Sequence, residues 1–357
     1  MTTAVWEFSH TSSSSVYTVL QNVQSFSFTE GKTGIQEPLK AKTGTITGFN
    51  PSALPTIEVG DAINIRLDGT DYAFFAVADF VVDYGLLSSM DTWTITLEGA
   101  FAQAGRVTTS CTIPAGVDTY NATYYATVGT GINVDFYIGQ PPAVETVSGQ
   151  VIENESVLNI LQRIINTEQG GLSEGGAYGL MGWISQTQKP NTPQYLFTDG
   201  TVGSPLSSDI QYDNLQFAGI AQNYFTEVVV SPVGGTEQTV GTAGRTLFLE
   251  TYSDTDQDAL DIGGYALATV NSRARVPYQI SCIYERQANN NLRYIGLNTL
   301  QRIILRGSTY LVYVTGRTVT STPNETRFTF DLVDGQSVGF FTLDNTYFGI
   351  LDQNKLS

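Results

Sequence analysis

The side chains that could do acid–base or nucleophilic chemistry are few in this sequence. Its one histidine, His10, lies in a polar N-terminal stretch that includes the serine run Ser12–Ser15. A Ser-His-Asp or Cys-His site would have to use this histidine, and no G-x-S-x-G, H-E-x-x-H or C-x-x-C motif occurs. We therefore expect a solvated His10, an N-terminal arm that becomes ordered only on assembly, and a protein that is not an enzyme.

Carboxylate pairs are the other route to catalysis, because glycosidases work with two acids and neither histidine nor metal. The densest acidic cluster consists of Asp254, Asp256, Asp258 and Asp261. Its start resembles a calcium loop, but neither the glycine at the sixth position nor the closing glutamate follows. A helix cap with an acidic first turn explains the cluster better, and Asp79 and Asp83 are expected to point outward from a strand. We expect no catalytic residue, no metal and no cofactor.

The two cysteines, Cys111 and Cys282, lie far apart in the sequence and in no metal-ligand spacing. We expect both to be small buried hydrophobic side chains. This cysteine usage is typical of a protein made in a reducing cytoplasm.

Composition and charge narrow the class of protein further. The chain has 357 residues, only 14% of them charged, with Gly 35, Tyr 19 and Phe 18, which indicates a folded, β-rich protein of two or three domains. The net charge of −17 argues against a surface that grips nucleic acid, because that requires clustered Lys and Arg. Like charge could still line a passage through which DNA slides without binding. We expect neither a signal peptide nor a membrane span.

The elements that would position any site are arranged around one helix, predicted over Asn154–Gly171. Asn154 is the expected N-cap and Gly170-Gly171 the expected stop. One apolar stripe has the i, i+3, i+4, i+7 spacing of a core-facing helix and consists of Val157, Ile160, Leu161, Ile164 and Ile165. A second helix is predicted over Asp254–Ser272, although Gly263-Gly264 weakens this prediction.

The rest of the chain has the two-residue period of strands. After a corner at Gly60-Asp61, Ile63, Ile65 and Leu67 are expected to face inward and Asn64, Arg66 and Asp68 outward. The other predicted strands are Tyr72–Tyr84, Asp91–Gly99, Thr119–Val128, Ile132–Ile138, Tyr224–Ser231 with its hairpin partner Arg245–Tyr252, Tyr278–Arg286, Arg302–Leu305, Thr309–Val319 and Glu325–Leu332. No clean sequence repeat is visible, although two similar β units flanking the first helix are possible.

The predicted fold is mainly β with minor α. Two β-barrel-like domains flank a small α/β segment, and a β-rich C-terminal tail follows. The expected division is a first β-barrel domain (1–108), a β-rich insertion or linker (109–150), a central helix with short strands (151–210), a second β-barrel domain (211–300) and a C-terminal β segment (301–357).

Several segments, in order along the chain, resemble the tail hub (minor tail or baseplate hub) protein of long-tailed bacteriophages. The first is Ile57–Leu67 followed by Tyr72–Phe80 and Thr94–Ala100; the second is Glu155–Gly171, similar to the family's central helix. The others are Tyr212–Leu215 with Asn223–Val230, and the C-terminal run Phe341–Leu356 with its Phe-Gly-x-Leu-Asp ending. Residues 109–150 have no counterpart in this pattern.

The resemblance implies a structural virion protein made in the host bacterial cytoplasm and placed at the tail tip. Family hubs are homotrimers in which each subunit gives two related β-barrels, so that three copies face a six-fold tube with six similar units. The resemblance implies an adaptor between the tail tube and the host-contacting apparatus. Its partners would be the distal tail ring, the tape measure and the tip or fibre proteins, with no sequence-specific binding of nucleic acid. Three copies would carry three times −17, or −51, and part of that charge would line the DNA passage.

Three other functions remain open at this stage, and one of them is a polysaccharide-degrading enzyme that would lose activity when a carboxylate such as Asp256 is changed to Asn. A distal tail ring protein would assemble as six copies instead of three, and a receptor- or glycan-binding tail module would carry exposed aromatic clusters on its loops. Under any of these functions the apolar C-terminus is the candidate interface, because so apolar a terminus rarely stays free. Its expected contact residues are Phe341, Leu343, Tyr347, Phe348, Ile350 and Leu351.

Overall fold

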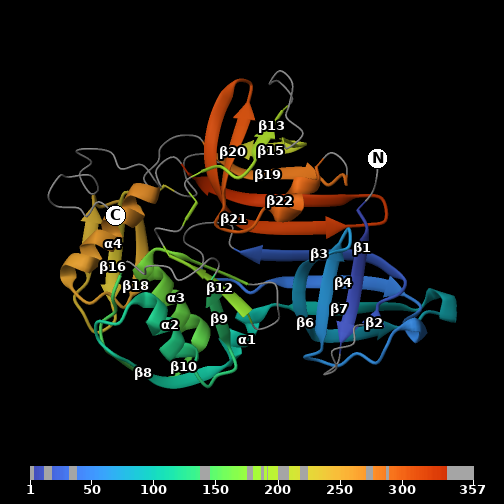
Figure 1. The fold of residues 1–357 in the computed structure, drawn as a ribbon, viewed down its shortest axis with the longest axis horizontal. Coiled ribbons are helices and arrows are strands. Elements are labelled where there is room, and N and C mark those ends of the chain that lie inside the picture. The colour runs from blue at the N-terminus through green and yellow to red at the C-terminus, as the bar shows by residue number, and fades with distance from the viewer. Residues whose placement is uncertain are drawn as a thin grey trace.

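The computed structural model describes residues 4–11, 18–31, 38–136, 145–174, 180–185, 189–190, 192–199, 209–217, 224–270, 276–286 and 289–335. As predicted, the fold is mainly β with minor α (Figure 1). The helices in these ranges are α1 (Ala100–Arg106), α2 (Thr119–Thr127), α3 (Val157–Glu168) and α4 (Asp256–Val270), with short 3-10 turns at Pro51–Ala53, Ser88–Met90 and Asn290–Tyr294.

One 14-stranded sheet contains most of the strands that the structure describes. Its main path runs through β14 (Ile210–Gln211), β13 (Leu196–Thr198), β20 (Leu300–Leu305), β21 (Ser308–Ser321), β3 (Val23–Gly31), β4 (Thr43–Phe49), β7 (Thr92–Glu98), β6 (Thr70–Asp83), β5 (Ala62–Leu67), β1 (Trp6–Thr11) and β2 (Thr18–Val19). A branch leaves β21 through β22 (Thr326–Asp334), β19 (Pro277–Ile283) and β15 (Asn214–Phe217). The antiparallel pair β3–β21 therefore joins the N-terminal strands to the C-terminal strands.

Three smaller sheets carry the helices. They are β8 (Thr108–Ile113) with β10 (Gln150–Ser156); β9 (Asn133–Phe136), β12 (Leu180–Ile184) and β11 (Gly171–Glu174); and β17 (Gln238–Gly241), β16 (Glu227–Pro232) and β18 (Thr246–Thr251). Helix α4 packs on β16 and β17, and its Gly263 makes this possible, because a Cβ there would lie 2.8 Å from Val240 Cγ2. The glycine that weakened the helix prediction is thus a packing requirement, and the helix itself is confirmed.

Two hairpins in the large sheet share one construction, which we call the first hairpin unit (β5–β6–β7) and the second hairpin unit (β20–β21–β22). Each begins with a six-residue strand and a two-residue turn with positive φ at both positions, Asp68-Gly69 (φ 50 and 79) and Arg306-Gly307 (φ 49 and 82). Such turns match the twist of the flanking strands and favour glycine at the second position. A 14-residue strand follows in both units.

Both long strands are also interrupted near their middle by a register shift, at Val77/Asp79 in β6 and at Val314/Gly316 in β21. Such β-bulges bend a strand and increase its twist. Each strand pairs before its bulge with the short strand that precedes it, and continues beyond the bulge along the strand that follows it. The chain therefore contains a structural duplication that its sequence hardly records.

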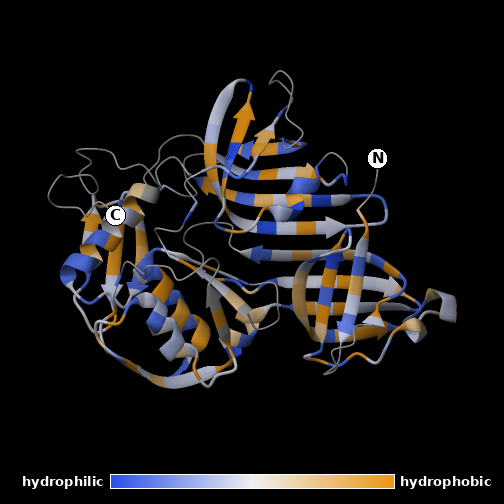
Figure 2. Cartoon of the chain, in the orientation of Figure 1, coloured by the Kyte–Doolittle hydropathy of each residue, from blue (hydrophilic) through white to orange (hydrophobic). Residues whose placement is uncertain are grey.

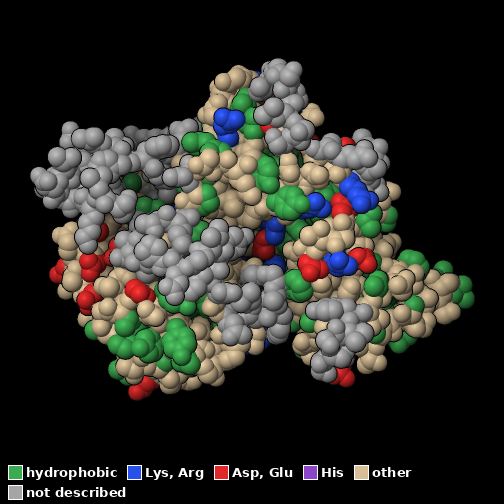
Figure 3. All heavy atoms as spheres, in the orientation of Figure 1, with side chains coloured by type: hydrophobic (Ala, Val, Ile, Leu, Met, Phe, Trp, Pro, Cys, Tyr) green, Lys and Arg blue, Asp and Glu red, His purple; other side chains and the backbone are tan. Residues whose placement is uncertain are grey.

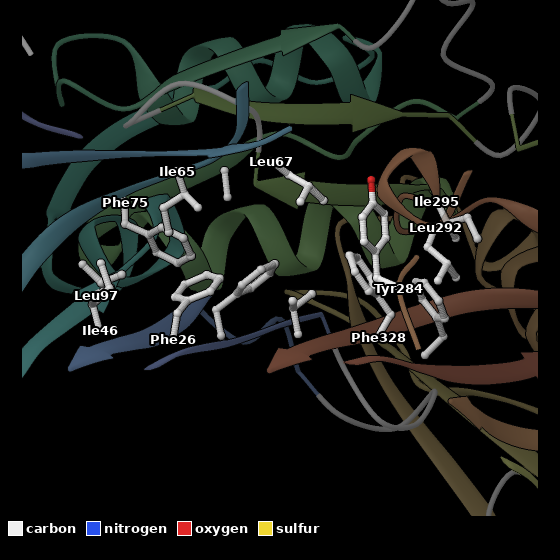
Figure 4. Close-up of a cluster of buried hydrophobic side chains, with 14 of the residues drawn as sticks. Phe26, Ile46, Ile65, Leu67, Phe75, Leu97, Tyr284, Leu292, Ile295 and Phe328 are labelled. Atoms are coloured by element: carbon white, nitrogen blue, oxygen red, sulfur yellow. The ribbon is translucent and has the colours of Figure 1, made fainter. Parts of the chain in front are cut away.

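One hydrophobic core runs under both hairpin units. In Figure 4, Phe26 and Phe75 of the N-terminal half lie toward one end of this cluster and Tyr284 and Phe328 toward the other. A chain of rings connects the two ends, since Phe28–Tyr72, Tyr72–Phe328 and Phe328–Tyr284 have centroids 6.0, 6.1 and 5.6 Å apart. Offset and edge contacts of this kind stabilise beyond area burial by about 1 kcal/mol each. Hydrophobic and hydrophilic bands alternate along the strands, as Figure 2 shows.

The predicted inward residues of β5 are all buried, and so are Trp93, Ile95 and Leu97 of β7. Asn64, expected to face outward, is buried as well. Its Nδ2 donates to Asp71 Oδ1 at 3.0 Å across the hairpin, which satisfies one buried polar group with the other strand's carboxylate. Asp79 and Asp83 are exposed, as expected.

Helix α3 buries all five residues of the predicted stripe, but its ends differ from the prediction. Ser156, not Asn154, is the N-cap, and its side chain accepts from Asn159 N at 3.3 Å. Asn154 lies in β10, at a bulge with φ 50, because the strand continues to the helix start. The left-handed C-cap is Gln169 (φ 53), one residue before the predicted glycines.

Three further predictions were wrong. Thr119–Val128, read as a strand from its alternation, is helix α2, capped by Asp118 accepting from Asn121 N at 2.6 Å. Its buried side chains follow a helical spacing: Thr119, Ala122, Thr123, Ala126 and Thr127. The N-terminal arm contains strand β1, paired with β5 along its whole length, whereas Ser12–Ser15 lie outside the described residues.

The last correction concerns the hairpin after β16. Its hairpin partner is β17, and β18 (predicted as Arg245–Tyr252) pairs with β16 in parallel on the other side. The connection from β17 crosses at Thr226, whose carbonyl accepts from Thr242 N at 2.8 Å and whose Oγ1 accepts from Arg245 N at 3.1 Å.

Candidate functional site

A cluster of buried charges, which we call the charged junction, lies between the two hairpin units, where β3 pairs with β21. Glu30 of β3 and Arg317 of β21 form an ion pair between the two strands, and Lys42 Nζ lies 3.8 Å from the other oxygen of Glu30. All three side chains are less than 10% exposed. Buried ion pairs are weak sources of net stability, but removal of one partner is costly because a charge is left in the interior.

Aromatic faces and one carbonyl complete the surroundings of these cations. Arg317 lies 5.0 Å from the ring centroid of Tyr72 and 5.5 Å from that of Phe28, and its Nη1 donates to Ile295 O at 3.0 Å. Lys42 Nζ lies 4.7 Å from the centroid of Phe75. Cation–π contacts of desolvated groups contribute about 2 kcal/mol each. The junction therefore fixes the register between β3 and β21 and offers no activated reactive group.

Glu174, at the end of β11, joins the central segment to the same junction. Its Oε1 accepts from Phe101 N at 2.7 Å and from Lys42 N at 3.1 Å, so one carboxylate holds the starts of α1 and β4. Burial raises the pKa of Glu174 to about 7, although the Lys42 charge and the two backbone donors act in the opposite direction. Gly99 makes room for this carboxylate, since a Cβ there would lie 1.7 Å from Oε2.

A hollow of about 160 Å³, which we call the junction groove, lies where the parts of the chain meet. Its walls come from β3 and the segment after it, α1, α3, β11, β18, α4, β21 and β22. Apolar side chains dominate the walls and include Leu39, Phe101, Leu249, Leu297, Tyr313 and Val333. Lys40 and Lys189 also line it, and Lys189 Nζ donates to Gln169 O at 2.7 Å.

An exposed apolar tip projects from the connection between β6 and β7. Tyr84, Leu86, Leu87 and Met90 are 81%, 95%, 58% and 59% exposed. Hydrophobic side chains are visible at the right-hand end of the molecule in Figure 3, where this connection projects beyond β6 and β7 in Figure 1. Clustered apolar side chains on a projecting loop are typical of a protein–protein contact. The corresponding turn of the second hairpin unit, Thr322–Glu325, is short and polar.

The predicted interface residues of the C-terminus are not among the residues that the structure describes. Phe341, Leu343, Tyr347, Phe348, Ile350 and Leu351 all lie outside the described residues. Their role as an interface stays a prediction.

The acidic cluster is a helix start, as expected. Thr255 and Asp258 form a reciprocal cap: Thr255 N donates to Asp258 Oδ2 at 3.0 Å and Asp258 N donates to Thr255 Oγ1 at 3.1 Å. Within the part of the chain that the structure describes, no group of three His, Cys, Asp or Glu side chains could hold a metal ion. No helix in those same ranges is long and apolar enough to cross a membrane.

His10 is not the solvated side chain that was expected. It is buried in β1, and its Nε2 lies 2.7 Å from Asp61 Oδ2, which also accepts from Glu58 N at 2.7 Å. This pair ties β1 to the corner before β5. Cys282 is buried as expected and Cys111 is half-buried; burial raises the pKa of both thiols, so neither is an activated nucleophile.

Sequence reasoning missed the charged junction and the apolar tip. The junction residues are spread from Glu30 to Arg317, so no local spacing connects them. The tip did leave a signal, because Tyr84-Gly-Leu-Leu places three large apolar residues in a connection between two alternating strands.

Comparison with solved structures shows what this fold is. A 43 kDa tail protein of prophage MuSo2 from Shewanella oneidensis matches with a TM-score of 0.66 at 12% identity, covering 94% of this chain and 100% of that one. A tail protein from Neisseria meningitidis MC58 matches with a TM-score of 0.64 at 11% identity, covering 93% and 97%. Prophage tail protein gp18 from Listeria monocytogenes EGD-e matches with a TM-score of 0.57 at 10% identity, covering 91% and 94%.

The chain therefore has the fold of phage tail proteins over nearly its whole length, as the sequence resemblance implied. No family model and no curated protein matches it. At identities of 10–12% the likeness concerns the fold.

Proposed function

We propose that this chain is a structural virion protein of a phage tail tip, a trimeric hub that adapts the tail tube to the host-contacting apparatus and encloses a DNA passage. The fold supports a role in a tail. The observation that carries the hub is the duplication of the hairpin unit within one chain. Three copies with two similar units each would present six units to a six-fold partner, whereas a chain with one unit would need six copies.

The charged junction supports the same proposal. A hub must hold its two units at a fixed angle if they are to occupy neighbouring positions in one ring. Glu30, Lys42 and Arg317 fix the β3–β21 pairing, and a buried ion pair of this kind specifies register because any slip leaves a charge unpaired.

The apolar tip at Tyr84–Met90 is the surface proposed to contact the next protein of the tail. The distal tail ring, the tape measure and the tip or fibre proteins are the proposed classes of neighbour. The acidic net charge of −17 per copy supports a passage that DNA crosses without binding.

Light scattering on the purified protein, with negative-stain imaging of the same peak, tests the proposal. We expect a mass of about 116 kDa, three times 38.7 kDa, and a ring with a central opening. A ring of about 232 kDa would contradict the hub and identify a distal tail ring with six copies.

A further inference from the structure

The C-terminal segment, residues 336–357, begins beside the junction groove. The described chain ends at Gly335, whose N donates to Leu311 O at 2.9 Å. Val333, two residues earlier, is itself part of the groove wall, as is Tyr313 of the adjacent strand. The described chain therefore ends within two residues of the hollow.

The groove and the segment have matching chemistry. The groove is a mainly apolar hollow of about 160 Å³ with two lysines among its lining residues, and an apolar cavity of about 150 Å³ accepts one benzene-sized ring. The segment carries Phe341 and Phe348 among its apolar residues, and two carboxylates, Asp344 and Asp352. An aromatic ring seated in the hollow would place the acidic residues near the lysines.

The short distance that the segment can span favours this hollow over a second, larger one. Phe341 is six residues beyond Gly335, and six extended residues span at most about 20 Å. The second hollow, of about 360 Å³, lies at the opposite end of β22, beside Thr326. Gly335 lies nine residues from Thr326, roughly 30 Å along β22, and the first aromatic residues of the segment cannot span this distance.

We propose that residues 341–351 pack in the junction groove of their own chain. The segment would then contact α4 and β18 on one side and β21 and β22 on the other. It would thereby connect the β17–β16–β18 sheet, on which α4 packs, to the second hairpin unit. Tethering at Gly335 gives the segment an effective concentration in the millimolar range at the groove, which favours this chain's groove over that of a second copy. The inference does not depend on the function proposed above.

Hydrogen exchange on the full-length protein tests this inference. We expect the amides of residues 341–351 to exchange at least tenfold more slowly than those of the same sequence as a free peptide. Leu249→Arg, which places a charge in the groove from β18, should abolish this protection, and so should Leu297→Arg from a separate wall. Phe248→Arg is the matched control, because Phe248 is the neighbouring residue on β18 and is 73% exposed. Amides of β6 and β21, followed in the same experiment, report whether each variant is folded.

Exchange of the segment at free-peptide rates in the unaltered protein would overturn the inference. So would protection that persists in a folded Leu249→Arg or Leu297→Arg protein. A mixing experiment tests whether the segment fills the groove of its own chain or of a second copy. Copies with both Phe341→Ser and Phe348→Ser keep the groove but lose the aromatic side chains of the segment, whereas Leu249→Arg copies keep the segment but lose the groove. The two proteins are unfolded and refolded together. Protection should stay absent from both; protection that returns in the Leu249→Arg copies would show that the segment fills the groove of a second copy.

Discussion

Replacement of Glu174 by glutamine should change how the stability of this protein depends on pH. Glutamine keeps an acceptor oxygen for Phe101 N and Lys42 N, which the carboxylate holds at 2.7 and 3.1 Å, but it does not titrate. The folded chain holds the Glu174 proton up to a pKa of about 7, chiefly because the carboxyl is buried, whereas the unfolded chain releases it near 4.5.

The sign and size follow from these two values. Between pH 4.5 and 7 the folded state binds more protons than the unfolded state, so the free energy of unfolding falls as the pH rises through this window. A shift of about 2.5 pK units at about 1.4 kcal/mol each gives a total loss of about 3.5 kcal/mol. Below pH 4.5 the carboxyl is neutral in both states, and the loss is absent. Glu174→Gln lacks this loss, and it should match the unaltered protein at pH 4 and exceed its stability by about 3.5 kcal/mol at pH 8.

Urea unfolding followed by tryptophan fluorescence at half-unit steps from pH 4 to pH 8 measures this difference, and Trp183 reports on the core beside β11. A difference between the two proteins that is constant across the range would refute the reasoning, because the carboxyl would then not be the titrating group. A difference that grows toward low pH would refute its sign.

Three further predictions test separate parts of the structure. Gly69→Ala and Gly307→Ala should each lower the free energy of unfolding by about 1 kcal/mol, because both glycines have positive φ, which alanine adopts with strain. The added Cβ would meet nothing within 4 Å at either position, so no clash adds to this cost. Thermal unfolding that gives unequal losses for the two variants would contradict the equivalence of the two turns. Arg317→Met should lower the free energy of unfolding, measured with urea, by about 3 kcal/mol, because it leaves the buried Glu30 carboxylate without its partner. The loss should be smaller in the double variant with Glu30→Gln, which removes that carboxylate charge. Leu86→Ser should change the free energy of unfolding by no more than about 0.5 kcal/mol, because the side chain is 95% exposed. The same substitution should reduce incorporation into tails, measured by the amount of the protein in purified particles. An amount equal to that of the unaltered protein would contradict the proposal that the apolar tip is a contact surface.

Elements with one strong period could be predicted from the sequence. The stripe from Val157 to Ile165 fits only a helix, and the alternation of β5 and β7 fits only a strand with one buried face. Their ends were less predictable, because caps depend on where the neighbouring element stops. Strand β10 continues to Ser156 through its pairing with β8, and so it excludes Asn154 as the cap.

Helix α2 was predicted as a strand because its threonine and alanine residues fit both the two-residue period of a strand and the 3.6-residue period of a helix. Thr119, Ala122, Thr123 and Ala126 form a buried helical face, yet threonine and tyrosine favour strands, and the alternation of the same stretch suggested one. The Asp118 cap was the one local signal for the helix.

The duplication and the junction were out of reach for a physical reason. The two hairpin units have in common the turn glycine and the tyrosine three residues after it (Tyr72 and Tyr310). The other strand residues differ, because a strand requires only that apolar and polar side chains alternate. The charged junction depends on the pairing of β3 with β21, which brings together residues from the two ends of the chain. Such long-range pairing is set by the whole fold and leaves no local pattern.

A three-dimensional reconstruction of the purified assembly by electron microscopy tests the central claim most directly. The hub account predicts a ring of three copies in which the first and second hairpin units alternate around a central opening, giving six similar positions with true three-fold symmetry. A ring in which six copies each place the same hairpin unit around the opening would contradict it.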